Sequence, residues 1–113
     1  MSGVELARAV GAMRGLGQAT VAAGHAYDAI LTPTLAALPA AVGALRDDTD
    51  PAGDFEAQKR FTPFTSPYNI SGLPAVSLPL HWAQTATGVL PVGVQLVGRR
   101  FGEVGLLSLA AQL

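Results

Sequence analysis

The residue types best suited to chemistry gather in one stretch, FTPFTSPYNISGLPAVSLPL, which spans residues 61–80. Three hydroxyl residues, Thr62, Thr65 and Ser66, lie within its first six positions, and an amide follows at Asn69. The stretch contains no charged residue. A serine hydrolase needs a nucleophilic serine, a base within hydrogen-bond reach and a group that orients the base. The first question is therefore whether a serine of this stretch has such partners.

The serines of the chain do not complete a catalytic set. None of the five lies in the G-x-S-x-G turn that exposes a nucleophile: Ser2, Ser66, Ser71, Ser77 and Ser108. Ser77 sits in an apolar strand pattern, where we expect a small core residue bonded to backbone. His81 follows that strand as a conceivable base for Ser66 or Ser71, but a single histidine at a strand end is usually structural. No pair of carboxylates is placed for acid–base work, so we predict no catalytic residue in this chain.

Other functional classes are excluded by composition. The chain has no cysteine, and its two histidines, His25 and His81, have no ligand-like spacing, so we expect neither a metal site nor a cofactor. The glycine-rich run GAMRGLG follows no strand and does not predict a phosphate loop. A net charge of −1 argues against nucleic acid as a partner.

The apolar content is high for so short a chain. Half of the 113 residues are apolar and 13% are charged, whereas a soluble domain has about 25% charged residues. This imbalance predicts that part of the surface is buried against more protein, either further polypeptide of the same domain or a partner. A membrane fits poorly, because the run at residues 29–45 is shorter than the ~20 residues of a spanning helix and is broken by Pro33 and Pro39. Glu5 and Arg8 interrupt any secretory signal, so we expect a cytoplasmic protein.

The elements that would position these side chains alternate between helix and strand. Ser2 and Glu5 form a capping-box pattern ahead of an apolar stripe at helical spacing, which predicts a helix over about residues 3–24. Residues 29–31 are predicted to form a buried strand ended by Pro33, and residues 35–45 irregular chain. Residues 46–60 carry most of the remaining charge and are predicted to form an exposed loop.

The second half predicts a hairpin and a helix. Residues 75–80 and 92–97 have strand patterns joined by a loop of about ten residues, and a helix is expected from about residue 103 to the C-terminus. No Asp, Glu, Lys or Arg occurs from Phe61 to Gly98, which predicts deep burial of this segment. Helices interleaved with buried strands indicate the α/β class.

Three stretches in this order resemble one known family. YDAILTPT, FTPFTSPYNISGLPAVSLPL and LPVGVQLVGRRFGEVGLLSLAAQL are similar to the C-terminal portion of the amidase signature family, the Ser-Ser-Lys serine amidohydrolases. The resemblance implies a three-layer α/β/α fold with a mixed sheet, several times longer than this chain, of which residues 1–113 would form a C-terminal part. The proline and phenylalanine of TPFTSPYN are closest to bacterial general amidases and nylon-oligomer hydrolases. Glutaminyl-tRNA amidotransferase A subunits tend to carry an acidic substrate-binding residue where this chain has Thr62.

The resemblance also implies a mechanism whose reactive groups lie elsewhere. In the family a lysine deprotonates a bridging serine, which activates a nucleophilic serine, and an acyl-enzyme releases a carboxylate and ammonia or an amine. Those residues precede the matched region, and the one lysine here, Lys59, lies in the charged segment. No catalytic residue is carried over, and the chain alone is expected to be inactive. Its partners would be a small-molecule amide and the missing N-terminal part of the domain, and a homo-oligomer is left open.

Four residues are candidates for the wall of the acyl pocket, namely Thr62, Phe64, Thr65 and Asn69. For Thr62 and Thr65, capping of a helix or turn is an equally good interpretation. For Asn69 we favour a buried amide that bonds loop backbone to a strand. Two other interpretations of the whole chain stay open: a non-catalytic remnant or fold-completing subunit, and part of a glutamine-dependent amidotransferase A subunit.

Overall fold

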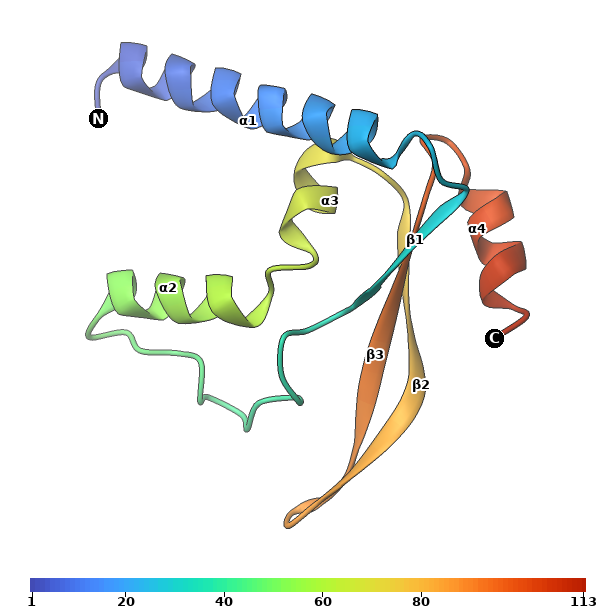
Figure 1. The fold of residues 1–113 in the computed structure, drawn as a ribbon. Helices are drawn as coiled ribbons and strands as arrows, with labels where there is room; N and C mark the ends of the chain where they lie inside the picture. Colours follow the sequence, from blue (N-terminus) through green and yellow to red (C-terminus); the bar gives the residue numbers. More distant parts are fainter.

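A computed structural model describes residues 1–113 as four helices and a three-stranded sheet (Figure 1). The elements in chain order are α1 (Gly3–Gly24), β1 (Ala29–Pro33), α2 (Pro51–Phe61), α3 (Ser66–Ser71), β2 (Ala75–Thr85), β3 (Gly88–Gly98) and α4 (Glu103–Ala110). The predicted α/β class is confirmed. Within this chain, however, the sheet is antiparallel throughout, with the strand order β1-β3-β2.

The first helix begins where its capping box predicted. The Ser2 backbone N–H donates to Glu5 Oε2 at 2.6 Å, and the Glu5 N–H donates to the Ser2 hydroxyl at 3.3 Å. The C-terminal half of α1 packs on α3, where Gly17 is buried against the backbone of Ile70. The N-terminal half extends beyond α3, away from the other elements (Figure 1).

The β2–β3 hairpin is longer than the sequence predicted. Both strands have 11 residues and are joined by only Ala86 and Thr87, so the expected ten-residue loop is wrong. A register shift between Pro79 and His81 lets β2 continue past the proline, which an edge strand tolerates. At the tip, the Thr85 hydroxyl donates to the Gly88 carbonyl at 2.6 Å and closes the turn.

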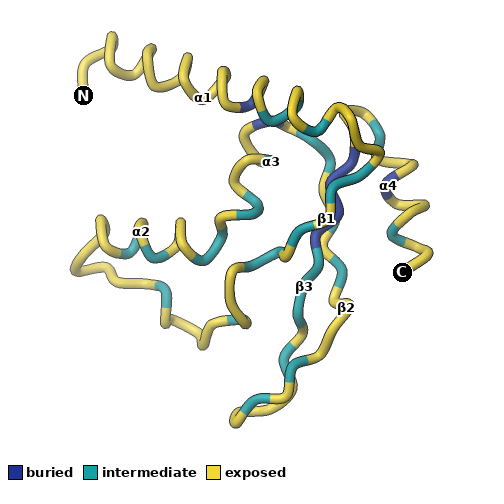
Figure 2. Tube along the Cα trace, in the orientation of Figure 1, coloured by how far each residue is buried: buried dark blue, intermediate teal, exposed yellow.

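The packed centre lies at the C-terminal end of β3. Leu96, Val97 and Leu106 are the buried apolar residues, and α4 contacts β2 and β3. A Cβ on Gly98 would lie 3.3 Å from Leu106 Cβ, so this glycine brings α4 close to the strand. Figure 2 shows burial confined to this end of the sheet and to the α1–α3 contact.

Most of the molecule is exposed. Only seven of 113 residues are buried, and the accessible surface is 8022 Å², where a compact monomer of this mass has about 5,800 Å². The radius of gyration is 16.8 Å, against about 13 Å for a compact domain of this length. The predicted deep burial of residues 61–98 is therefore wrong within this chain, because most of that segment is exposed or half-buried. Its lack of charge does not reflect packing against the rest of these 113 residues.

The charged segment is exposed, as expected, but it is not all loop. Residues 51–61 form α2, which Asp50 caps by accepting from the Gly53 N–H at 3.0 Å. Pro51 in the first turn and Lys59 near the helix C-terminus are the usual helix signals. No helix of the chain combines the length and the apolarity required to cross a membrane.

Candidate functional site

The candidate residues lie in and beside a four-residue link, residues 62–65, between α2 and α3. Thr62 follows α2 directly, and both its backbone N–H and its hydroxyl donate to the Gln58 carbonyl, at 3.0 and 2.9 Å. Thr65 precedes α3, but its hydroxyl donates to the Thr62 carbonyl at 3.2 Å and not to an α3 amide. The two threonine hydroxyls therefore bond to nearby backbone carbonyls, at the end of α2 and within the link itself. Thr62 also lines a groove of about 560 Å³ between the end of α2, at Gln58 and Phe61, and residues 35–46.

Asn69 does not have the environment that its preferred interpretation required. It lies on α3 with an exposed side chain, and its amide makes no hydrogen bond within the chain. The expected buried amide that joins loop to strand is therefore wrong for Asn69. Because α3 is only six residues long and packs against α1 through Ser71 and Ile70, Asn69 is left on an open side.

The role expected of Asn69 is filled by Gln95, which the sequence analysis did not single out. Gln95 is 4% exposed, at the middle of the sheet in β3. Its Nε2 donates to Thr32 Oγ1 at 3.1 Å and to the Phe64 carbonyl at 3.0 Å. The signal was a single polar residue in the apolar strand VGVQLV, since a buried polar side chain in a strand must find partners.

A second polar contact follows along the same face of the sheet. The hydroxyls of Thr34 and Ser77 lie 2.6 Å apart. Ser77 is exposed and bonded to a side chain, so the expectation of a core residue bonded to backbone is wrong. A Cβ on Gly93 would lie 2.7 Å from Thr34 Oγ1 and 2.9 Å from Ser77 Oγ. Only glycine leaves room for this hydroxyl pair.

These contacts form a polar strip on one face of the sheet. Thr32 and Ser77 both pair with Gln95 across the strands, and paired residues of neighbouring strands point to the same side. The strip, defined as Thr32, Thr34, Ser77 and Gln95, has no charge. It offers hydroxyl and amide groups that can donate and accept hydrogen bonds, but no group that can take up a proton near neutral pH. Within the chain these groups bond to one another and to the Phe64 carbonyl.

No serine near the link is prepared for nucleophilic attack. Ser66 Oγ donates to the Thr62 carbonyl and Ser71 Oγ to the Tyr68 carbonyl, each at 3.3 Å. His81 is exposed at the β2 irregularity and has no hydrogen bond to either serine. The structure also contains no group of three or more His, Asp or Glu residues that could hold a metal ion.

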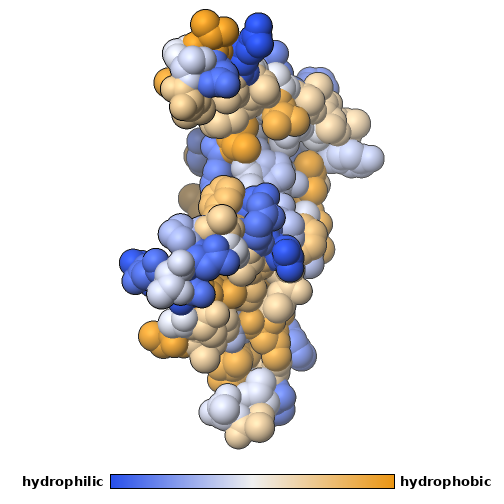
Figure 3. All heavy atoms as spheres, turned by 90° about the vertical axis from the view of Figure 1, so that its left-hand side faces the viewer, coloured by the Kyte–Doolittle hydropathy of each residue, from blue (hydrophilic) through white to orange (hydrophobic).

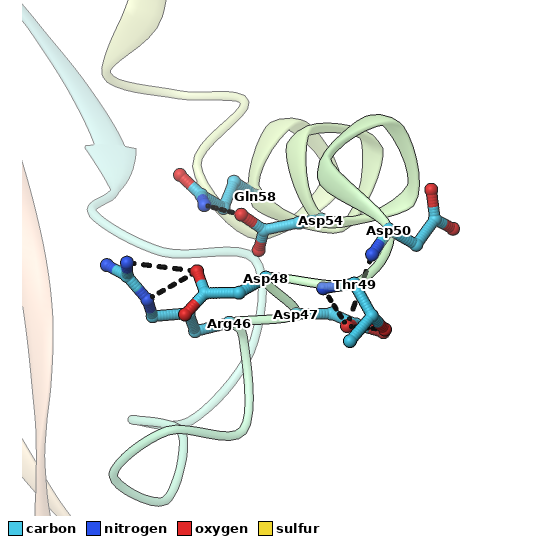
Figure 4. Close-up of polar contacts among 7 residues, drawn as sticks. All are labelled: Arg46, Asp47, Asp48, Thr49, Asp50, Asp54 and Gln58. Carbon is cyan, nitrogen blue, oxygen red and sulfur yellow. Dashed lines mark hydrogen bonds and ion pairs between the residues drawn. The ribbon is translucent and has the colours of Figure 1, made fainter.

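The two carboxyl groups with displaced pKa values lie outside the link. The backbone N–H of Ser2, and then its hydroxyl, hold the pKa of Glu5 below its ordinary value of 4.5. The Thr49 hydroxyl, followed by the Thr49 backbone N–H, lowers the pKa of Asp47 in the loop before α2 (Figure 4). Both shifts favour the charged form in exposed caps and turns and indicate no acid–base catalyst.

Comparison with known proteins identifies the family. The family model described as Amidase matches residues 4–107. Three similar relatives are glutamyl-tRNA(Gln) amidotransferase A subunits. The one from Pseudothermotoga lettingae is 38% identical over 84 residues, which cover 74% of this chain and 16% of the relative. The one from Synechococcus sp. is 40% identical over 91 residues, or 80% and 17%, and the one from Halobacterium salinarum is 42% identical over 84 residues, or 74% and 18%.

The chain therefore spans about a sixth of the length of these relatives. No solved structure matches. The finer likeness to bacterial general amidases and nylon-oligomer hydrolases stays a prediction, because the relatives above are amidotransferase subunits. The match over residues 4–107 is nonetheless sufficient for the broader assignment, and this chain belongs to the amidase family.

Proposed function

We propose that residues 1–113 form the C-terminal part of an amidase domain that hydrolyses linear carboxylic amides to an acid and ammonia or an amine. The reaction would pass through a serine acyl-enzyme whose lysine and serines belong to polypeptide outside these residues. The chain has one lysine, Lys59, exposed on α2 and paired with Glu56 at 2.6 Å. It therefore supplies structure to the site and not the reacting groups.

The exposed apolar surface is the observation that carries this proposal. The accessible surface exceeds that of a compact monomer by roughly 2,000 Å², an area typical of large, permanent interfaces. Along α1 the exposed apolar side chains include Leu6, Val10 and Met13. In Figure 3, viewed from the side of α2 and the N-terminal end of α1, apolar side chains reach the surface above and below a hydrophilic region.

Within the proposed enzyme, Thr62, Phe64, Thr65 and Asn69 would line or brace the acyl pocket. The link is uncharged, its threonines are half-buried, and Thr62 borders the 560 Å³ groove. The free amide of Asn69 is exposed on the same segment and is available to bind a ligand. These features suit the recognition of a neutral amide, which needs donors and acceptors and no counter-charge.

The first test uses the 113-residue chain by itself. We expect release of ammonia from a linear amide such as propionamide to equal the buffer rate, and the variants Ser66→Ala and Ser71→Ala to behave identically. Turnover by the wild-type chain that either substitution abolishes would overturn the proposal, because it would place a nucleophile within these residues.

The second test supplies the missing part. We would co-express the chain with the Synechococcus relative truncated to the residues that precede its matched region. Hydrolysis of propionamide by the pair, and by neither part alone, is the expected result. Val10→Asp places a charge in the exposed apolar stripe of α1 and should abolish complementation. Ala12→Asp adds the same charge on another face of the helix and should preserve it. A pair that never hydrolyses an amide would count against the proposal.

A second candidate function is that of an amidotransferase A subunit. It is favoured by the names of the relatives at 38–42% identity. The neutral Thr62, where such subunits tend to have an acidic residue, speaks against it. In the complemented pair, glutamine turnover far above that of propionamide would establish this alternative. Preference for propionamide, reversed toward glutamine by Thr62→Asp, would support the general amidase.

A third interpretation, a non-catalytic module, is distinguished by the state of the chain in solution. A monomer on gel filtration with slow hydrogen exchange throughout would indicate a module that folds alone. Association into larger species, or rapid exchange along α1, would support a part whose apolar surface requires more polypeptide. A discrete dimer would identify a homo-oligomer.

A further inference from the structure

We propose that Gln95 is a positioning residue that fixes the link of residues 62–65 against the sheet and thereby sets the shape of the amide-binding wall. The first half of this statement stands on hydrogen bonds within the chain. The second half rests on the proposed function, because it assigns that link to the acyl pocket.

Gln95 is built for two fixed partners. Its Nε2 carries two N–H groups, and one donates to Thr32 Oγ1 while the other donates to the Phe64 carbonyl. The side chain is 4% exposed, so water does not readily replace either partner. Leaving a buried donor or acceptor without a partner costs more free energy than leaving the same group unpaired at the surface. This cost favours the one orientation of the Gln95 amide in which both hydrogen bonds form.

The bond to Phe64 is also the only hydrogen bond that joins residues 62–71 to a strand. The other hydrogen bonds of the link are local and run within the link, to Gln58 at the end of α2, and from Ser66, Tyr68 and Asn69 of α3. Phe61, at the end of α2, is bonded to Ala36, which lies outside the sheet. α3 is held from its other side by α1 through Gly17. Apart from the chain connection of α3 to β2 through residues 72–74, the distance between the candidate wall and the polar strip therefore depends on Gln95.

No charged group competes for this side chain. β1 and residues 75–79 of β2 contain no titratable residue, and Tyr68 is the only one in residues 61–80.

A glutamate at position 95 would have nearly the same shape as glutamine. When ionised it has no donor and would face the Phe64 carbonyl, whereas when protonated it regains one O–H donor. Burial favours the protonated form of such a carboxyl, so the substitution gives a switch controlled by pH.

Hydrogen exchange of the 113-residue chain, followed by mass spectrometry, tests the positioning role. We expect the amides of residues 62–71 to exchange roughly 3- to 10-fold faster in Gln95→Leu, as loss of one hydrogen bond implies. Gln95→Glu should show the same loss at about pH 8 and partial recovery at about pH 5. Gln84→Leu and Gln84→Glu are the controls, because Gln84 is an exposed residue of the same hairpin without hydrogen-bonded side-chain partners.

A second measurement tests the substrate role in the complemented amidase. Gln95→Leu should raise KM for propionamide more than it lowers kcat, and Gln95→Glu should restore KM at the lower pH. Unchanged exchange in Gln95→Leu, or full exchange of residues 62–71 in the wild-type chain, would overturn the positioning role. Altered exchange with unchanged KM would overturn the substrate role alone. A wild-type pair without any activity would refute the proposed function and leave the positioning role to the exchange data.

Discussion

The two halves of α1 have the same sequence pattern and different surroundings. In the C-terminal half, Gly17 is buried and lies against the Ile70 carbonyl of α3. In the N-terminal half, the same face carries Leu6, Val10 and Met13, which are 50%, 39% and 52% exposed. A helical apolar stripe shows that a face will be covered, but it does not show what covers it. Here the stripe is longer than the surface that the chain offers to it.

The β2–β3 hairpin repeats this contrast. The end of β3 near α4 contains Leu96 and Val97, at 4% and 1% exposure. Toward the tip, Trp82 is 57% exposed and Val89 is 49% exposed. Each long element thus has a packed end and an open end, and the packed ends meet around α3, α4 and the C-terminal part of β3.

The largest expected effect is a difference in stability between substitution of a buried leucine and substitution of an exposed methionine. Leu96→Ala should lower the free energy of unfolding by about 2–3 kcal/mol, because it leaves a cavity in the packed end of β3. Met13→Ala should change it by less than about 0.5 kcal/mol, because the Met13 side chain is already largely in water. Urea denaturation of the chain measures both values. Equal losses of stability in the two variants would show that the N-terminal half of α1 is covered in solution. A free energy of unfolding that depends on protein concentration would identify a second copy of the chain as the covering surface.

Alanine substitutions at two glycines of α1 should change the stability of the fold in opposite directions. A Cβ at position 17 would lie 3.0 Å from the Ile70 carbonyl oxygen and 3.4 Å from Ser71 Cα, and neither backbone atom can move freely. Gly17→Ala should therefore destabilise the fold by about 1–3 kcal/mol. At Gly11 no atom lies within 4 Å of the added Cβ, so Gly11→Ala should stabilise the helix by up to about 1 kcal/mol. Thermal unfolding checks the signs, and a stabilising Gly17→Ala would mean that α1 does not pack on α3.

Local sequence signals predicted the elements well. The capping box at Ser2 and Glu5, the proline that ends β1 and the apolar strands of the hairpin act over a few residues, and the structure confirms each of them. The signals for α2 were equally local, with Asp50 and Pro51 at its start. They were overlooked because a dense run of charges was taken as loop. The hairpin loop was overestimated because the strand patterns were ended at Leu80 and begun again at Val92, whereas β2 continues to Thr85 and β3 begins at Gly88.

The site could be predicted only in part. The segment that contains Thr62, Phe64 and Thr65 was identified from its hydroxyls and its resemblance to the family, but the residue that joins it to the sheet was not. Gln95 is 31 positions from Phe64 in sequence, and this contact depends on how the link folds back over β3. Burial of the uncharged segment was also predicted from composition, which does not distinguish packing within a chain from packing against another surface.

The smallest expected effect concerns the free end of α1. The pKa of Glu5 is below 4.5 in the folded chain because Ser2 donates to the carboxylate, so the charged form stabilises the helix start. This contribution is present above the unfolded pKa and is lost as the pH falls through the lower folded value. Glu5→Gln cannot titrate, so the difference in far-UV helicity between wild type and Glu5→Gln should shrink from about pH 7 to about pH 3. Glu103→Gln is the matched control, because Glu103 lies in the first turn of α4, where no side-chain cap forms. Since no other element holds the first turns of α1, the loss of helicity at low pH should be confined to that end. A loss of structure that also reaches α3 would show that the exposed half of α1 supports the packed half.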